Sequence, residues 1–258
     1  MLNRPNRREF AASALALLAA GPAVAFAQDE PKNDNSKDLP KPDSIPKVTL
    51  LPTLPTVPVR RGAPGFNVQM VDASLLPRDK QGIWVLNFAF KPMRMRTVEI
   101  PGKGRKQIHY LYYRVVNRTG QPREFVPQFT VITDTNKRFE ESVIPKAVPL
   151  IQNREDPTIK VLGAVDVAGV LPPSTKQTVD DAVFGVALWE GIDPNADRMS
   201  IYVRGLSDGY QDVSSADGGK PVTKYKTLRI DLIRRGDARN LNEKEITLAE
   251  PAYEWVYW

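Results

Sequence analysis

The 258-residue chain contains no cysteine and a single histidine, His109. Without thiolates the chain cannot form disulfides, iron–sulfur clusters or a cysteine nucleophile, and one imidazole is too few for the usual zinc sites. Only sites for ions that prefer oxygen ligands, such as calcium, remain possible. We therefore expect no cofactor and no metal site, and a hydrophobic core that stabilises the fold without cross-links.

Long apolar runs and a strong charge excess are also lacking. After residue 27, no apolar run reaches the length of about 20 residues that a membrane-spanning helix needs. Lys and Arg number 36 against 30 Asp and Glu, and this excess is spread along the chain. Nucleic-acid binding needs a concentrated basic stripe instead. We expect neither a nucleic-acid partner nor a transmembrane span once the N-terminal segment is removed.

The first 27 residues have the pattern of an export signal. The charged stretch Asn6–Phe10 precedes an Ala/Leu-rich run that ends in Ala25–Ala27, the order typical of a cleavable signal. The paired arginines before Phe10 resemble a twin-arginine signal, whose pathway carries folded proteins. The two residues after Phe10 depart from that pattern, so an ordinary signal for unfolded export stays open. We expect cleavage after Ala27, or retention as an anchor as the alternative, and a location in the bacterial envelope, periplasmic or extracellular.

Residues 28–64 are rich in proline and poor in aromatic residues. Such a segment cannot bury enough apolar surface to offset the entropy of ordering it, and its prolines favour an extended spacer. We predict a linker over 28–64 and a single folded domain over 65–258. The stretch Val48–Val59 is more apolar, which leaves pairing with a sheet edge open.

From residue 66 onward, apolar and polar residues alternate with the period of β-strands. About nine strands are expected, at 66–70, 83–90, 108–116, 125–131, 158–167, 182–190, 199–206, 225–234 and 253–257. This spacing predicts a mainly β fold, an immunoglobulin-like antiparallel β-sandwich, with a closed β-barrel or a jelly roll as the alternative. The alternation assigns to the core Trp84, Phe88, Tyr112, Phe129, Phe184 and Trp189.

One segment, between Glu141 and Asp156, has helical spacing instead. Apolar residues there recur three, four and seven positions apart, on one face of a helix. Pro149 would break a long helix, because it lacks a backbone donor and clashes one turn back, but it is tolerated in a first turn. We therefore predict one short helical insertion that begins near Val148.

Few residues have the pattern of a catalytic site. His109 has no serine-nucleophile motif to accompany it. Glu140-Glu141 and Asp180-Asp181 are adjacent pairs, whose side chains point to opposite faces of a strand. A two-carboxylate hydrolase would need acids from distant loops, such as Glu141 or Asp181 with Asp212. The sequence favours a non-catalytic protein without deciding against an enzyme.

Basic and aromatic residues are the candidates for contact with a partner. Basic residues precede the domain and form a hairpin tip, and aromatic residues crowd the C-terminal strand. Charged tips also occur on any soluble sheet, and the aromatic side chains can equally complete the core, which we favour for the last strand. The candidates are Arg60, Arg61, Lys103, Arg105, Lys106, Trp255 and Trp258.

Four phrases of the sequence resemble a family of uncharacterised exported bacterial β-sandwich proteins. They are Tyr113–Gly120, Trp189–Pro194, Ile201–Leu206 and Glu254–Tyr257. The resemblance runs from Trp84 to the end of the chain. It implies a sandwich fold and no known activity, so no catalytic residue is carried over.

These observations predict a non-catalytic exported envelope protein. It would bind or scaffold a protein or an anionic polymer, with an envelope protein or a polysaccharide as its partner. The alternative is a carbohydrate-active protein, either a sugar-binding module or a two-carboxylate hydrolase. Exposed aromatic side chains beside a cleft would favour the second interpretation, and aromatic side chains sealed in the core would count against it.

The double substitution Arg7→Lys and Arg8→Lys should block export, because the twin-arginine route requires both guanidinium groups. Cell fractionation with detection of the mature chain would measure this. Normal export of the double variant would show that the signal belongs to the route for unfolded proteins.

Overall fold

The computed structural model describes residues 50–61, 68–214, 220–235 and 244–258. The predicted signal and residues 28–49 of the predicted linker lie outside this part. Among the described residues no helix is long and apolar enough to cross a membrane.

The first sheet is built around two long antiparallel strands, β5 and β11. Its members are β1 (Val57–Arg60), β2 (Gln69–Met70), β3 (Asn87–Phe90), β4 (Arg94–Ile100), β5 (Gly104–Val116), β9 (Val161–Leu162) and β11 (Val179–Glu190). The order is β1-β11-β5-β3-β2, while β4 pairs with β5 and β9 lies parallel to β11. From Ile108 in β5 and from Ala182 in β11 onward, nearly every residue is buried, as expected for strands that are covered on both faces.

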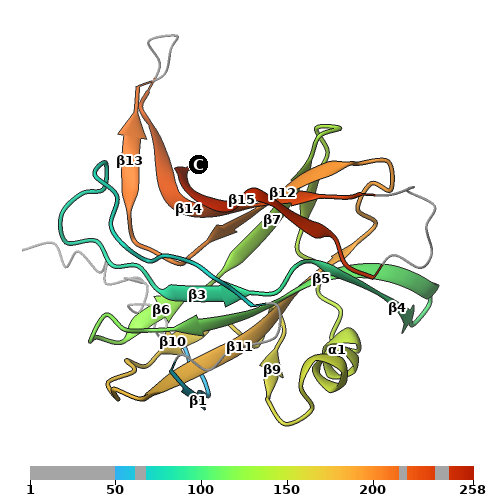
Figure 1. The fold of residues 1–258 in the computed structure, drawn as a ribbon, viewed down its shortest axis with the longest axis horizontal. Coiled ribbons are helices and arrows are strands. Elements are labelled where there is room, and N and C mark those ends of the chain that lie inside the picture. Colours follow the sequence, from blue (N-terminus) through green and yellow to red (C-terminus); the bar gives the residue numbers. More distant parts are fainter. Residues whose placement is uncertain (1–49, 62–67, 215–219, 236–243) are drawn as a thin grey trace, which may run out of the picture. The chain divides into compact units, whose positions relative to one another are not determined.

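The second sheet follows the order β13-β14-β12-β7-β8, with β15 also paired to β14 (Figure 1). Its members are β7 (Gln128–Thr133), β8 (Arg138–Glu140), β12 (Arg198–Arg204), β13 (Tyr210–Val213), β14 (Val222–Ile233) and β15 (Thr247–Tyr257). Strands β6 (Arg123–Phe125) and β10 (Gly169–Leu171) form a separate pair. The described strands form open sheets and not a closed barrel, which confirms the mainly β, antiparallel sandwich.

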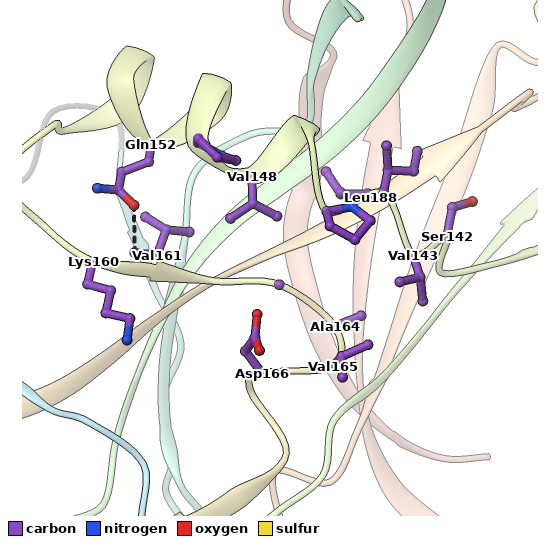
Figure 2. Close-up of a pocket in the computed structure, with 14 residues that line it drawn as sticks. Ser142, Val143, Val148, Gln152, Lys160, Val161, Ala164, Val165, Asp166 and Leu188 are labelled. Atoms are coloured by element: carbon purple, nitrogen blue, oxygen red, sulfur yellow. Dashed lines mark hydrogen bonds between the residues drawn. The ribbon is translucent and has the colours of Figure 1, made fainter. Parts of the chain in front are cut away.

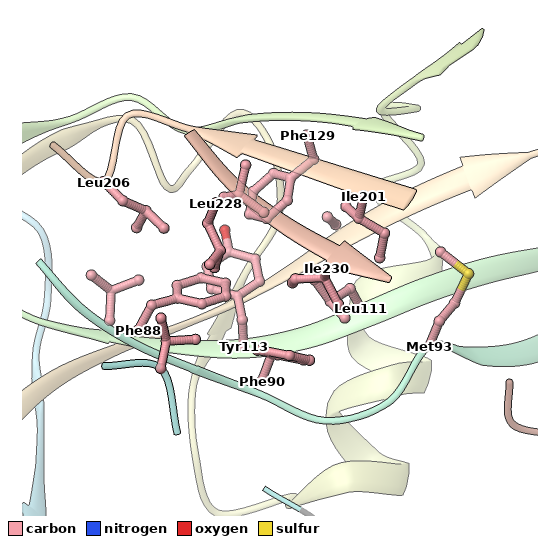
Figure 3. Packing of buried hydrophobic residues seen from close by; sticks show 14 of the residues in the cluster. Phe88, Phe90, Met93, Leu111, Tyr113, Phe129, Ile201, Leu206, Leu228 and Ile230 are labelled. Carbon is pink, nitrogen blue, oxygen red and sulfur yellow. The ribbon is translucent and has the colours of Figure 1, made fainter. Parts of the chain in front are cut away.

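The main core lies between the two large sheets (Figure 3). The Tyr113 ring of β5 stacks on Phe88 at 5.5 Å and approaches Phe129 of β7 at 4.9 Å, measured between ring centroids. Phe129 meets Trp189 edge-on. Such pairs stabilise a fold by about 0.5–1.5 kcal/mol each beyond their buried area. Of the six aromatic residues predicted for the core, five are buried and Trp84 is half-buried against the same cluster.

A second apolar cluster covers the outer face of the first sheet. Helix α1 (Ala147–Glu155) places Ala147 and Ile151 there, against the outward side chains of β5 and β11. The predicted short helix is confirmed, and Pro149 stands in its first turn. The predicted strand 158–167 is wrong outside β9. The Asp156 carboxylate accepts the Thr158 amide, and two amides converge on the Gly163 carbonyl, so turns occupy the rest.

Strand β1 lies inside the segment that was predicted as a linker. It pairs antiparallel with β11, with Arg60 opposite Val179. Leu54 is buried in the main core, and its amide donates to the Val170 carbonyl at 2.9 Å. β1 is an edge strand and pairs on one side only. Pro58, which has no backbone N–H, therefore leaves no hydrogen bond unmade on a second side. The folded domain therefore includes residues before Gly65, as the pairing alternative for Val48–Val59 allows.

A buried ion pair fastens the 72–80 loop to the last two strands. The side chains of Lys226 on β14 and Asp79 are 0% and 1% exposed, and the two are hydrogen-bonded. Asp79 also accepts the Tyr257 hydroxyl and the Leu76 amide, both at 2.7 Å. Desolvation pushes the pKa of Asp79 up, but the bonds from Lys226 and Tyr257 outweigh it and hold the pKa below its ordinary value.

Lys226→Met should lower the free energy of unfolding by about 3–5 kcal/mol, because it leaves the Asp79 carboxylate buried without its cation. Adding Asp79→Asn removes that charge and keeps an acceptor for Tyr257, so the double variant should recover part of the loss. Urea unfolding of both variants would measure these changes in the free energy of unfolding. Arg138→Gln, in the exposed Arg138–Glu140 pair, is the control and should cost under about 1 kcal/mol. Additive losses in the double variant would contradict the coupling.

Candidate functional site

An apolar pocket lies in a groove beside helix α1, which we call the α1 groove (Figure 2). Its volume is about 260 Å³. One wall is α1 with the 142–145 segment before it, the other is the 160–166 segment, and Leu188 of β11 lines it from the sheet. In Figure 2, Val148 points from α1 toward the 160–166 segment, and the Gln152 side chain accepts the Val161 amide at 3.3 Å.

The rim of the α1 groove combines exposed apolar side chains with charge. Val143 is 60% exposed and Val165 68% exposed. Lys160 and Asp166 are exposed at the same rim, and within the described residues neither has an ion-pair partner. The groove thus offers an apolar floor with two free charges of opposite sign.

A buried carboxylate fixes the helix that forms this groove. Glu155, the last residue of α1, accepts Lys91, Arg94 and Tyr110 at 2.8 Å each. Its side chain is almost fully buried. Desolvation raises its pKa, but the three hydrogen bonds outweigh that effect and the pKa lies below its ordinary value. The groove therefore has one rigid wall.

The predicted basic residues do not form one surface. Arg60 pairs with Val179 at one end of β11, while the Lys103–Lys106 tip extends beyond Glu190 at the other end. The eleven residue-to-residue steps from Val179 to Glu190 correspond to about 36 Å. Arg61 is engaged by the buried Asp180, at 2.9 Å, and Lys103 by Glu190, at 2.9 Å.

Arg60, Arg105 and Lys106 are exposed, and none has an ion-pair partner among the described residues. They lie on the separated ends of the sheet, so the structure offers an anionic polymer no continuous track through them. Contact of single residues with a partner stays a prediction.

The two C-terminal tryptophans have different positions. Trp255 is buried in the main core, and its indole nitrogen donates to the Asp72 carbonyl at 2.8 Å. The Trp255 indole therefore packs in the core, as predicted from the sequence for the last strand. Trp258 is half-buried on the outer face of the second sheet, where its ring stacks on Tyr202 at 4.5 Å. Only Trp258 remains accessible to a partner.

His109 and the predicted carboxylates are not assembled into one centre. His109 is buried on β5, with Nε2 3.4 Å from the Arg234 guanidinium. Burial, with Arg234 beside it, lowers the pKa of His109 to about 4. Asp181 is approached by Lys176, and Asp212 accepts the Thr223 hydroxyl on a different sheet. No group of three or more His, Asp or Glu that could hold a metal ion occurs in the described ranges.

Glu141, one of the predicted carboxylates, has an unusual environment. It follows β8, and one of its carboxyl oxygens is buried without a hydrogen-bond partner in the described part of the chain. Burial raises the pKa of Glu141 to about 8, so its carboxyl group is protonated at neutral pH. A neutral carboxylic acid can donate a hydrogen bond, which an ionised one cannot do.

The α1 groove was not predicted from the sequence. The helical spacing and Pro149 located the helix, but the opposite wall was predicted as a strand. A signal was present in Asp156 and Gly163, whose turn chemistry argues against a continuous strand there. No protein-family model, curated protein or solved structure matches the chain.

Glu141→Gln should remove a pH-dependent loss of stability. The unfolded carboxyl group releases its proton near pH 4.5, while the folded one holds it until about pH 8. Rising pH therefore favours unfolding between these values, by a few kcal/mol in total, since one pKa unit corresponds to about 1.4 kcal/mol. Urea unfolding of wild type and variant from pH 4 to pH 9 would show the difference.

Glu140→Gln, at the exposed neighbouring position, is the matched control. The Glu141→Gln variant should gain stability relative to wild type as pH rises, and the Glu140→Gln variant should not. Parallel curves for wild type and Glu141→Gln would contradict the raised pKa of Glu141.

Proposed function

We propose that this chain is a non-catalytic binding module of the bacterial envelope, and that its α1 groove takes an apolar segment of a partner protein. The observation that carries the proposal is the pair of exposed valines, Val143 and Val165, over an apolar floor. Exposed apolar side chains at the edge of a concave site are typical of interaction surfaces.

The size of the groove supports a protein segment over a free small molecule. Sites for drug-sized ligands usually enclose about 300–1,000 Å³. The α1 groove, at about 260 Å³, lies just below that range. It is open to solvent along its rim, so one or two apolar side chains of a partner would fill it while the rest of the partner lies across α1.

The charged rim supports a polypeptide partner as well. Lys160 and Asp166 can pair with opposite charges that flank an apolar segment, and they would then set its direction across the groove. Exposed charge pairs mainly add specificity and association rate, so the apolar contacts would supply most of the affinity. The rigid wall held by Glu155 limits the entropy lost on binding.

Export to the envelope and the resemblance to exported sandwich proteins complete the proposal. Both rest on the sequence, on the signal-like first 27 residues and on the four family-like phrases. The partner proposed here is therefore an envelope protein.

Val143→Asp and Val165→Asp should abolish partner binding with little effect on folding, because both side chains are largely exposed. The matched control is Val222→Asp, at a 56% exposed valine on β14. A photo-reactive residue introduced at position 150 on α1, in the full chain in intact envelopes, should form a discrete adduct. That adduct should survive Val222→Asp and disappear in Val165→Asp.

The purified partner identified in this way should bind the full chain in solution, and Val143→Asp should weaken binding by about tenfold or more, a loss of about 1.4 kcal/mol. An adduct that persists in both groove variants, or equal affinity of all three variants, would overturn the assignment of the groove.

A further inference from the structure

A second concave surface lies on the outer face of the second sheet, next to Trp258. We call it the Trp258 hollow; its volume is about 470 Å³. Its lining comes from β7, from β8 with the residue after it, from β12 and from the end of the chain. The polar and aromatic members are Gln128, Phe129, Thr130, Arg138, Glu140, Glu141, Arg204 and Trp258.

Both guanidinium groups that line this hollow lie over aromatic rings. The Trp258 ring stacks on Tyr202 of β12 at 4.5 Å, and the Arg138 guanidinium lies 5.2 Å from the Trp258 ring centroid. Arg204 lies 4.2 Å from the centroid of Tyr225. Trp258 is anchored by its backbone, which exchanges two hydrogen bonds with Tyr225, at 3.0 and 3.1 Å. The chain therefore holds the indole across the sheet in a fixed position.

The charges of the hollow leave one cation uncompensated. Arg138 is paired with Glu140, at 2.6 Å, and Glu140 also accepts the Thr130 hydroxyl. Arg204 has no carboxylate partner among the described residues. Glu141 adds no negative charge at neutral pH, because burial raises its pKa to about 8. The hollow thus carries a net charge near +1 from these side chains.

We infer that the Trp258 hollow binds a saccharide that carries a carboxylate. The apolar C–H face of a sugar ring can pack on the accessible part of Trp258, and the Arg204 guanidinium can pair with the carboxylate in two parallel hydrogen bonds. Gln128 and Glu140 are placed to bind ring hydroxyls, and the protonated Glu141 can donate to a sugar oxygen. One uncompensated cation matches a singly charged carboxylate better than a doubly charged phosphate.

This site is separate from the proposed function of the α1 groove, although Ala164 lines both surfaces. Of the residues named as contact candidates from the sequence, it uses only Trp258. A carboxylated saccharide is thus the chemical class proposed for the polysaccharide partner, whose identity the sequence left open. Binding of this saccharide requires no hydrolytic step.

The test is binding of the full chain to an array of carboxylated oligosaccharides, each printed beside its methyl ester. Methyl esterification removes the charge and keeps the ring, so only the carboxylate is varied. Tri-galacturonate, with its trimethyl ester, serves as the probe for titration calorimetry. We expect the acid forms to bind and the esters to bind at least about tenfold more weakly, because the ester cannot form charge-assisted hydrogen bonds with Arg204.

Arg204→Gln and Trp258→Ala should each weaken binding of the acid by about tenfold or more. Arg198→Gln is the matched control, on the same strand and the same face but outside the hollow, and it should bind like wild type. Far-ultraviolet circular dichroism checks that each variant is folded. If Trp258→Ala does not fold, Arg204→Gln alone decides.

Three results would overturn the inference. The first is an array on which no carboxylated saccharide binds, and the second is equal binding of acids and esters. The third is binding that Arg204→Gln leaves unchanged. Stronger binding of sulfated or phosphorylated sugars than of carboxylated ones would also contradict the carboxylate assignment.

Discussion

The constraint on which the rest of the structure depends is the burial of the first sheet on both faces. Strands β5 and β11 are apolar on both sides, so neither side can face water. The second sheet covers one side and forms the aromatic core with it. The other side requires a separate cover, and α1 with Ile144 just before it supplies part of it. Because one short helix cannot cover the whole face, the α1 groove remains at its edge.

Buried carboxylates connect these layers by pairing with basic side chains from other elements. Glu155 binds Lys91 and Arg94 where α1 meets the sheet, and Asp180 binds Arg61 and Arg118 where β1 joins it. Asp79 and Lys226 do the same between a loop and β14. Such pairs stabilise little beyond their desolvation cost, but removing one partner is costly, so they fix which elements meet.

Sequence patterns predicted the parts of the fold that depend on local chemistry. Alternation located β5, β7, β11, β12 and β14, and the position of Pro149 located the start of α1. Charge pairing could not be predicted in the same way, because Arg61 and Asp180 lie 119 positions apart. A basic residue in a sequence looks the same whether it meets a partner or a buried carboxylate. The Trp258 hollow was missed for a related reason, since its residues come from three strands that are distant in the sequence.

Turns and core account for most residues of four sequence phrases, Tyr113–Gly120, Trp189–Pro194, Ile201–Leu206 and Glu254–Tyr257. In Tyr113–Gly120, the Asn117 side chain is buried and bonds the Gln121 and Leu171 carbonyls, and Gly120 has a positive φ. In Ile201–Leu206, a side chain at Gly205 would meet the Val126 carbonyl oxygen at 2.7 Å. The fold therefore accounts for these residues.

Arg204 differs from its neighbours in this respect. It lies in the phrase Ile201–Leu206, but its guanidinium lies over the exposed Tyr225 ring and its side chain lines the Trp258 hollow. No contact of its side chain with the core occurs among the described residues. Val143 and Val165 of the α1 groove lie outside all four phrases. The Trp258 hollow therefore rests on strands of the second sheet, whereas the α1 groove is formed by a helix and loop segments outside that sheet.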